Sequence, residues 1–132
     1  MSDPAIQVQL DGDRRAYQPG DVLSGSLRLV AVEGRAVGPV EVSVLWHTEG
    51  KGDEDLGVHF WEPVAPEDVW IEPGAWRRFA VRLPRSPLSY DGLIVKVRWC
   101  VRVRAVIAGW SDRVAEAPFQ LGDVASAPEA DS

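Results

Sequence analysis

Basic side chains gather along one side of residues 93–106, where they could bind an anion. Apolar and polar residues alternate along this segment, which predicts a long, half-buried strand. Arginine suits anion binding because its planar guanidinium can hold a carboxylate or a phosphate at two points. The candidate residues of this basic face, two of them expected on a nearby strand, are Lys96, Arg98, Arg102, Arg104, Arg78 and Arg82.

Two interpretations of this basic face stay open. In the first, it is a solvated sheet face whose arginines pair with acids on neighbouring strands, such as Glu41. In the second, it docks an acidic peptide, a phosphate or an acidic protein surface. The charge distribution allows both, because residues 77–113 carry nine Arg and Lys but only two acids, Asp91 and Asp112.

An acidic segment, residues 49–55, interrupts two predicted strands and is expected to form an exposed hairpin loop. Loops at the end of a sandwich often carry recognition, so this loop is a second candidate for partner binding. Carboxylates beside His47 and His59 could also ligate a metal ion or a small molecule. The spacing matches no complete calcium loop and no zinc motif, so a metal site is the alternative interpretation. The loop residues concerned are Glu49, Lys51, Asp53, Glu54 and Asp55.

Cys100 is the only cysteine, and it lies in the middle of the basic strand. Neighbouring arginines could lower the pKa of its thiol and favour a reactive thiolate. Neither histidine is near it in sequence, and the chain has no glycine-rich phosphate loop and no nucleophile elbow. We therefore expect no catalytic activity, with a small hydrolase built on the hairpin histidines as the competing interpretation. No cofactor is expected.

Aromatic residues between turn signals form the last candidate site, an apolar patch. Tryptophan is favoured at protein interfaces, so these side chains could contact a partner. They could equally belong to an edge strand that folds back over the core. The residues are Phe60, Trp61, Trp70 and Trp76.

The chain as a whole restricts these possibilities. Its 132 residues suit one domain, which we expect over residues 1–121, with a disordered tail over 122–132. The net charge of −6 argues against general nucleic-acid binding. No apolar run is long enough to span a membrane, and the N-terminus lacks the features of a signal peptide. With a single cysteine, a cytoplasmic protein is expected.

Short strands must position these residues. Val40, Val42 and Val44 alternate with polar residues in one strand, and residues 79–83 alternate in another. Turn clusters, rich in the ten prolines and twelve glycines, separate such strands, and no helical spacing extends over ten residues. This pattern predicts an all-β, antiparallel β-sandwich, with Trp46 and Trp99 in its core.

Two motifs resemble those of arrestin-like domains. The first is Tyr17–Asp21, which reads Tyr-Gln-Pro-Gly-Asp and is followed by Gly25. The second runs from Phe79 to Pro84 and continues through Pro87–Gly92 into the long strand. The resemblance covers roughly residues 5–121, and bacterial sporulation-control proteins are similar in their N-terminal half. It implies an immunoglobulin-like, arrestin-like sandwich of about seven to eight strands and a role as an adaptor or scaffold.

The chain departs from that family in length. Arrestins have two lobes, whereas 132 residues suffice for one, so receptor engagement between lobes does not carry over. We expect a non-catalytic module that binds a protein partner through the acidic loop, the basic face or an exposed edge. Opposite charges on one molecule also predict salt-sensitive, head-to-tail self-association. A structural subunit of a larger assembly is a further alternative.

Overall fold

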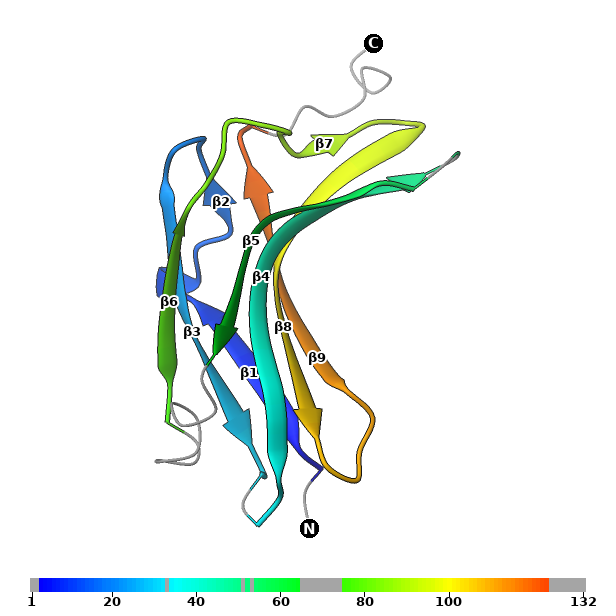
Figure 1. The fold of residues 1–132 in the computed structure, drawn as a ribbon. Helices are drawn as coiled ribbons and strands as arrows, with labels where there is room; N and C mark the ends of the chain where they lie inside the picture. Colours follow the sequence, from blue (N-terminus) through cyan, green and yellow to red (C-terminus); the bar gives the residue numbers. More distant parts are fainter. Residues whose placement is uncertain (1–2, 33, 51, 53, 65–74, 124–132) are drawn as a thin grey trace.

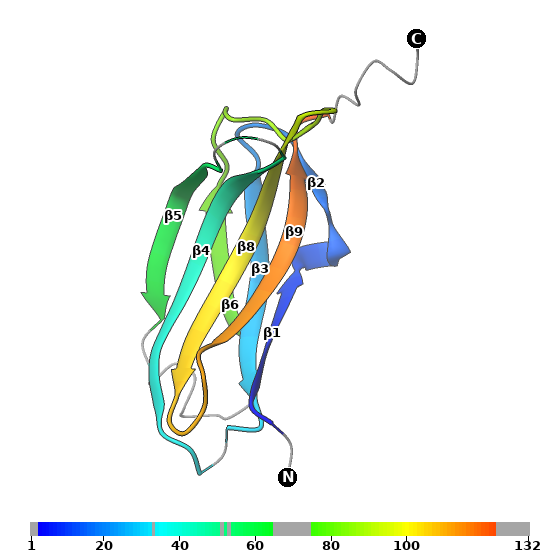
Figure 2. The same cartoon turned by 90° about the vertical axis from the view of Figure 1, so that its right-hand side faces the viewer.

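The fold is a two-layer β-sandwich, seen from two directions in Figures 1 and 2. The computed structural model describes residues 3–32, 34–50, 52, 54–64 and 75–123. Nine strands and one short 3-10 turn, η1 (Asp11–Asp13), occur in these ranges. The strands are β1 (Ala5–Leu10), β2 (Ala16–Tyr17), β3 (Val22–Val30), β4 (Val37–Gly50), β5 (Leu56–Val64), β6 (Arg77–Arg82), β7 (Tyr90–Asp91), β8 (Val95–Ile107) and β9 (Arg113–Leu121).

The strands form one small and one large sheet. The small sheet has the order β1-β3-β6, and the large sheet has the order β2-β9-β8-β4-β5, with β7 paired to the start of β8. The predicted all-β sandwich is confirmed. Two details differ from the prediction. The described residues form nine strands rather than seven or eight, and two of these, β2 and β7, are only two residues long. In addition, β2 pairs with β9 in parallel.

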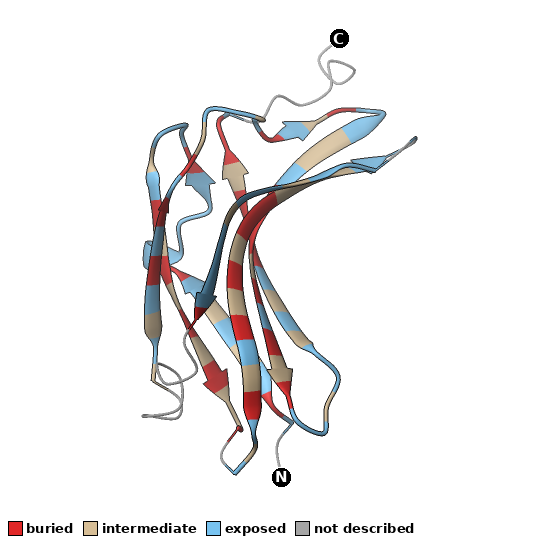
Figure 3. Ribbon diagram, in the orientation of Figure 1, coloured by how far each residue is buried: buried red, intermediate tan, exposed pale blue. Residues whose placement is uncertain are grey.

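The core lies between the two sheets, where buried positions recur along β3, β4, β6, β8 and β9 (Figure 3). Val40, Val42 and Val44 of β4 are fully buried, as the alternation predicts. Trp99 is buried as predicted, and its indole N–H donates to the carbonyl of Pro87 at 2.8 Å. Burial of these apolar side chains supplies the main stabilisation of the two layers.

Gly25 of β3 permits the close packing of the small sheet. A Cβ atom at this position would lie 2.5 Å from the carbonyl oxygen of Gln9 and 2.8 Å from the ring of Phe79. These contacts are too short for any other residue, so glycine is required here by packing.

The large sheet is strongly bent, so β4 and β8 arch away from the small sheet at one end (Figure 1). The β4–β5 pairing shifts register between Val44 and Leu45, which leaves His59 without a partner in the ladder. Such a β-bulge increases local twist and bends the strand. Leu45 and Cys100 pair with each other on the outer face, yet each is almost fully buried, because the bend crowds side chains on its concave side.

The motif Tyr17–Asp21 crosses from the large sheet to the small one. Tyr17 pairs with Leu121 of β9, in the large sheet. Three residues later, the N–H of Gly20 donates to the carbonyl of Leu83, directly after β6 in the small sheet, at 3.1 Å. Gly20 has a φ of 88°, the left-handed conformation that glycine adopts at little cost.

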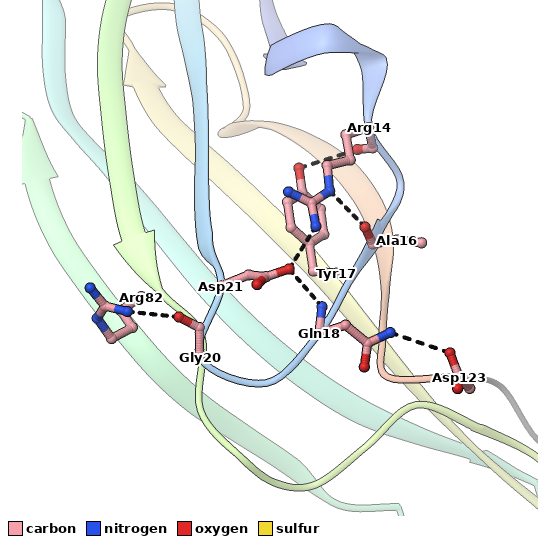
Figure 4. A network of polar contacts seen from close by, with 8 residues as sticks. All are labelled: Arg14, Ala16, Tyr17, Gln18, Gly20, Asp21, Arg82 and Asp123. Carbon is pink, nitrogen blue, oxygen red and sulfur yellow. Dashed lines mark hydrogen bonds and ion pairs between the residues drawn. The ribbon is translucent and has the colours of Figure 1, made fainter.

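A network of polar contacts fixes this crossing (Figure 4). The carboxylate of Asp21 accepts the backbone N–H of Gln18 at 2.9 Å and the guanidinium of Arg14 at 2.6 Å. Both contacts lower the pKa of Asp21, the backbone N–H more than the arginine. The side chain of Gln18 also donates to Asp123 at 3.2 Å, which ties the turn to the end of β9.

The second family-like motif reaches the same end of the sandwich. Ser89 is buried, and its N–H donates to the carbonyl of Leu121 at 2.9 Å. The hydroxyl of Ser89 accepts the N–H of Leu121 at 2.8 Å. The next N–H, of Gly122, donates to the carbonyl of Tyr17 at 2.7 Å. The two motifs therefore meet at the C-terminal end of β9, where they join the sheets.

Candidate functional site

The candidate site is the concave face, which we define as the outer side of β5, β4, β8 and β9. Cross-strand register sets its members, because residues directly opposite in antiparallel strands share a face. Arg102 lies between Ser43 of β4 and Glu116 of β9, and Arg104 lies between Glu41 and Val114. The exposed apolar side chains Leu56, Val58 and Trp61 line the β5 side of the face.

Each basic residue of β8 on this face has an acidic partner. Lys96 pairs with Asp91 at 3.4 Å, Arg98 with Glu49 at 3.5 Å and Arg102 with Glu116 at 2.7 Å. Arg104 lies between two acids, Glu41 at 3.0 Å and Asp112, which both raise its pKa. These ion pairs are those that the solvated-face interpretation expected, Glu41 included. The positive charge of β8 is thus neutralised locally.

Arg78 and Arg82 do not belong to this face. They lie on β6, in the small sheet, so the expectation that they extend the basic face of β8 is wrong. Arg78 donates to both carboxylate oxygens of Asp11, at 2.6 and 2.5 Å, and Arg82 donates to the carbonyl of Gly20 at 2.7 Å. The error arose because β6 precedes β8 in the sequence but pairs with β3.

A hollow of about 560 Å³ opens on the concave face where the sheet bends. Three acids of the hairpin, Glu49, Glu54 and Asp55, line it together with Glu116, against the single arginine Arg102. With His47 neutral, these residues carry four negative charges and one positive charge. The wall also includes His47, Thr48 and Leu56.

Short-range contacts hold the wall of this hollow in place. Nε2 of His47 lies 3.1 Å from the carboxylate of Glu49. This contact, followed by the charge of Arg98, lowers the pKa of Glu49. The hydroxyl of Thr48 accepts the N–H of Asp55 at 2.8 Å, which closes the hairpin below its tip. Lys51 and Asp53 of the predicted loop lie outside the described residues.

The two histidines face opposite sides of the large sheet. His47 lines the hollow, whereas His59 contacts the carbonyl of Arg82 at 2.8 Å and stacks edge-on against Trp99. Among the residues that the structure describes, no three His, Cys, Asp or Glu side chains gather as a metal site would require. Because the two histidines lie on opposite sides of the sheet, they do not share one site across the hairpin.

Cys100 is buried, and burial raises the pKa of its thiol to about 11. Glu116 adds to this rise, and Arg102 opposes it. The arginines therefore do not lower the pKa of this thiol, because desolvation outweighs their charge. The bend that covers Cys100 has no signature in the strand's own sequence.

The predicted apolar patch is not a single surface. Phe60 packs against the core, whereas Trp61, the next residue, lies 54% exposed on the concave face. Trp76 lies directly before β6 in the small sheet, and the guanidinium of Arg28 stacks over it at 4.4 Å. Trp70 lies outside the described residues. Phe60 and Trp61 separate because successive strand residues point to opposite faces, and Trp76 is separated from both by its place in the other sheet.

Sequence reasoning missed Glu116, the partner of Arg102. Its signal was present, since a hairpin at Gly109–Trp110 places residue 116 opposite residue 102. The long strand, predicted over residues 93–106, spans Val95–Ile107. Leu93 lies 77% exposed in the preceding turn. Within the described ranges, no helix is long and apolar enough to cross a bilayer.

With this geometry in place, comparisons with known proteins address the fold. No family model and no curated protein sequence matches the chain. Among solved structures, the crystal structure of Spo0M, the sporulation control protein from Bacillus subtilis, matches 93% of this chain at a TM-score of 0.61. The chain has an arrestin-like fold. The two sequences are 14% identical, and the chain spans about half (51%) of the length of Spo0M.

Proposed function

We propose that this protein is a non-catalytic interaction module that binds a partner protein on the concave face of its large sheet. The hollow at the bend carries the proposal, because it joins charged side chains of β4, β8, β9 and the hairpin in one open surface. The exposed apolar residues Leu56 and Val58 lie beside these charges. Charged groups around exposed apolar surface are the usual composition of a recognition site. The arrestin-like fold is consistent with this role.

The charges of the hollow favour a basic segment of the partner. The hollow is lined by one arginine, Arg102, and by four acids, Glu49, Glu54, Asp55 and Glu116. Positively charged side chains of a partner are therefore attracted more strongly than negatively charged ones. The sequence alone allowed an acidic partner for the arginines of β8. Their existing ion pairs reduce the attraction that such a partner would experience.

Site-specific photo-crosslinking in the source cells tests this proposal. A photoreactive residue replaces Leu56, which is 57% exposed beside the hollow, or Val22, which is 47% exposed on the small sheet. We expect a discrete protein adduct from position 56 and none from position 22. Equal adducts from both positions, or none from position 56, would contradict the proposal.

Charge reversal provides the matched test of partner chemistry. Glu54→Lys with Asp55→Lys reverses two charges of the hollow, and we expect the position-56 adduct to fall at least about tenfold. Glu62→Lys is the control, because Glu62 lies on β5 opposite the core residue Val42 and faces away from the concave face. If the hollow binds a basic segment, the control variant keeps the adduct. An adduct that increases after the double reversal would instead indicate an acidic partner.

A further inference from the structure

The turn between β7 and β8 presents two adjacent apolar side chains to solvent. The N–H of Gly92 donates to the carbonyl of Val95 at 3.1 Å, which leaves Leu93 and Ile94 at the tip. They are 77% and 69% exposed, more than any other large apolar side chain in the described part of the chain. Gly, Asn, Asp and Ser are the usual residues of such turns. Two large apolar residues at this tip therefore indicate a contact that covers them.

An apolar hollow of about 630 Å³ lies at the other end of the large sheet, between the start of β4 and the end of β5. Its one charged residue is Glu41, which accepts the indole N–H of Trp61 at 3.1 Å and the guanidinium of Arg104 at 3.0 Å. These bonds hold the Trp61 wall in position. The volume is in the range of sites that bind apolar ligands. The lining residues are Val37, Gly38, Pro39, Val40, Glu41, Trp61, Pro63 and Val64.

The tip of one molecule cannot reach its own hollow. Val37, which lines the hollow, is the first residue of β4, and Gly50, paired with Val95 beside the tip, is the last. These 14 residues correspond to roughly 40 Å of extended strand. Even with the bend of the sheet, a contact between tip and hollow must join two molecules.

Charge disfavours the contact of two tips with each other. The described parts of the two adjoining hairpins carry two more negative than positive charges. The acids are Glu49, Glu54, Asp55 and Asp91, and the bases are Lys96 and Arg98. Two such ends repel each other, whereas the hollow is lined by a single acid, Glu41, which already accepts a hydrogen bond from Arg104. The charges therefore favour tip-to-hollow contact over a symmetric tip-to-tip dimer.

We infer that copies of this chain associate head to tail, with the Leu93–Ile94 tip of one copy in the Trp61 hollow of the next. Such a contact is heterologous, so it leaves one free tip and one free hollow and can extend into short chains. The contact area is small, and we expect weak association at high micromolar to millimolar concentration. Because the contact is apolar, added salt does not weaken it, unlike the charge-driven association predicted from sequence.

Sedimentation velocity over a concentration series tests this inference. The wild type is expected to show a mean mass that rises with concentration, equally at low and high salt. Leu93→Ser with Ile94→Ser removes the tip, and Trp61→Glu places a charge in the hollow. Each variant alone is expected to associate at least about tenfold more weakly. The matched controls are Val22→Ser and Trp76→Glu, which change exposed apolar residues elsewhere and should associate like the wild type.

Mixing the two defective variants gives the decisive result. The tip variant retains its hollow and the hollow variant retains its tip, so a one-to-one mixture should form a dimer that cannot extend. Misfolding of either variant or a symmetric interface cannot produce this result. A wild type that stays monomeric throughout, or a mixture that stays monomeric while the wild type associates, would overturn the inference. Neither result bears on the concave hollow, whose crosslinking test uses different residues.

Discussion

The C-terminal end of β9 and the concave face differ in what their polar groups bind. At the C-terminal end of β9, both family-like motifs converge: Ser89 exchanges hydrogen bonds with Leu121, and the carbonyl of Tyr17 accepts the N–H of Gly122. On the concave face, charged side chains such as Glu54 and Arg102 line an open hollow. At the end of β9 the polar groups hydrogen-bond to one another, whereas on the concave face they line a hollow that is open to solvent.

This difference separates architecture from recognition. The residues that carry the resemblance to arrestin-like domains act on the fold, because they fix the crossing from one sheet to the other. The concave face depends on the bend at Val44–Leu45, which those motifs do not include. A fold shared at 14% identity therefore conveys little about which surface binds a partner.

The largest expected effect is on stability, from Gly25→Ala in the first motif. The added Cβ would meet the Gln9 carbonyl oxygen at 2.5 Å and the Phe79 ring at 2.8 Å. We expect a loss of about 2–3 kcal/mol in the free energy of unfolding, measured by urea denaturation. Ser43→Ala, on the concave face, is the control and should change it by less than about 1 kcal/mol. Equal losses in both variants would remove the distinction between the two regions.

A smaller loss is expected for Ser89→Ala at the same end of the sandwich. The change leaves the N–H of Leu121 without its acceptor in a buried position. Such an unsatisfied donor costs about 1–2 kcal/mol, which chemical denaturation can measure. Ser86→Ala is the matched control, since Ser86 is exposed in the same loop. Stability unchanged by Ser89→Ala would show that this bond does not hold the two motifs together.

The ion pairs of the concave face should contribute less. A double-mutant cycle with Arg102→Gln and Glu116→Gln measures the coupling of the pair, whose side chains are 35% and 42% exposed. Solvent screening limits such couplings, so we expect less than about 1 kcal/mol. A coupling energy of several kcal/mol would mean that this ion pair stabilises the fold, as the hydrogen bonds at the C-terminal end of β9 do.

The smallest effect concerns acid stability. Hydrogen bonds from Arg78 and Ser24 lower the pKa of Asp11 from 3.8 to about 2, and the pKa of Asp21 is lowered as well. A carboxyl group with a lowered pKa stabilises the fold above its unfolded pKa, and this contribution is lost as the pH falls through the folded value. Stability should therefore decrease between about pH 4 and pH 2.

Asp11→Asn and Asp21→Asn should flatten this decrease, since asparagine does not titrate. Asp13→Asn is the comparison variant, because Asp13 is a neighbouring exposed carboxyl whose contact is with Arg15 of the same turn. Melting temperatures measured across the pH range provide the test. An identical slope in Asp11→Asn and the wild type would show that Asp11 does not contribute.

The sequence predicted the architecture and misplaced several site residues. The alternation of Val40–Val44 and the turn clusters rich in Pro and Gly follow local rules, so the all-β architecture and the burial of these valines were predicted correctly. Sheet membership does not follow such rules, and Arg78 and Arg82 were therefore assigned to the wrong sheet. The burial of Cys100 depends on a bend produced by pairing between β4 and β5, which Cys100 itself does not encode.

The most direct measurement combines crosslinking with stability in two variants. Photo-crosslinking from position 56 and urea denaturation are carried out with Glu54→Lys and Asp55→Lys together, and separately with Ser89→Ala. We predict that the charge reversal abolishes the adduct at unchanged stability, and that Ser89→Ala lowers stability while the folded protein keeps the adduct. An adduct of unchanged strength after the charge reversal, or one that disappears with Ser89→Ala in the folded protein, would contradict recognition by the concave face.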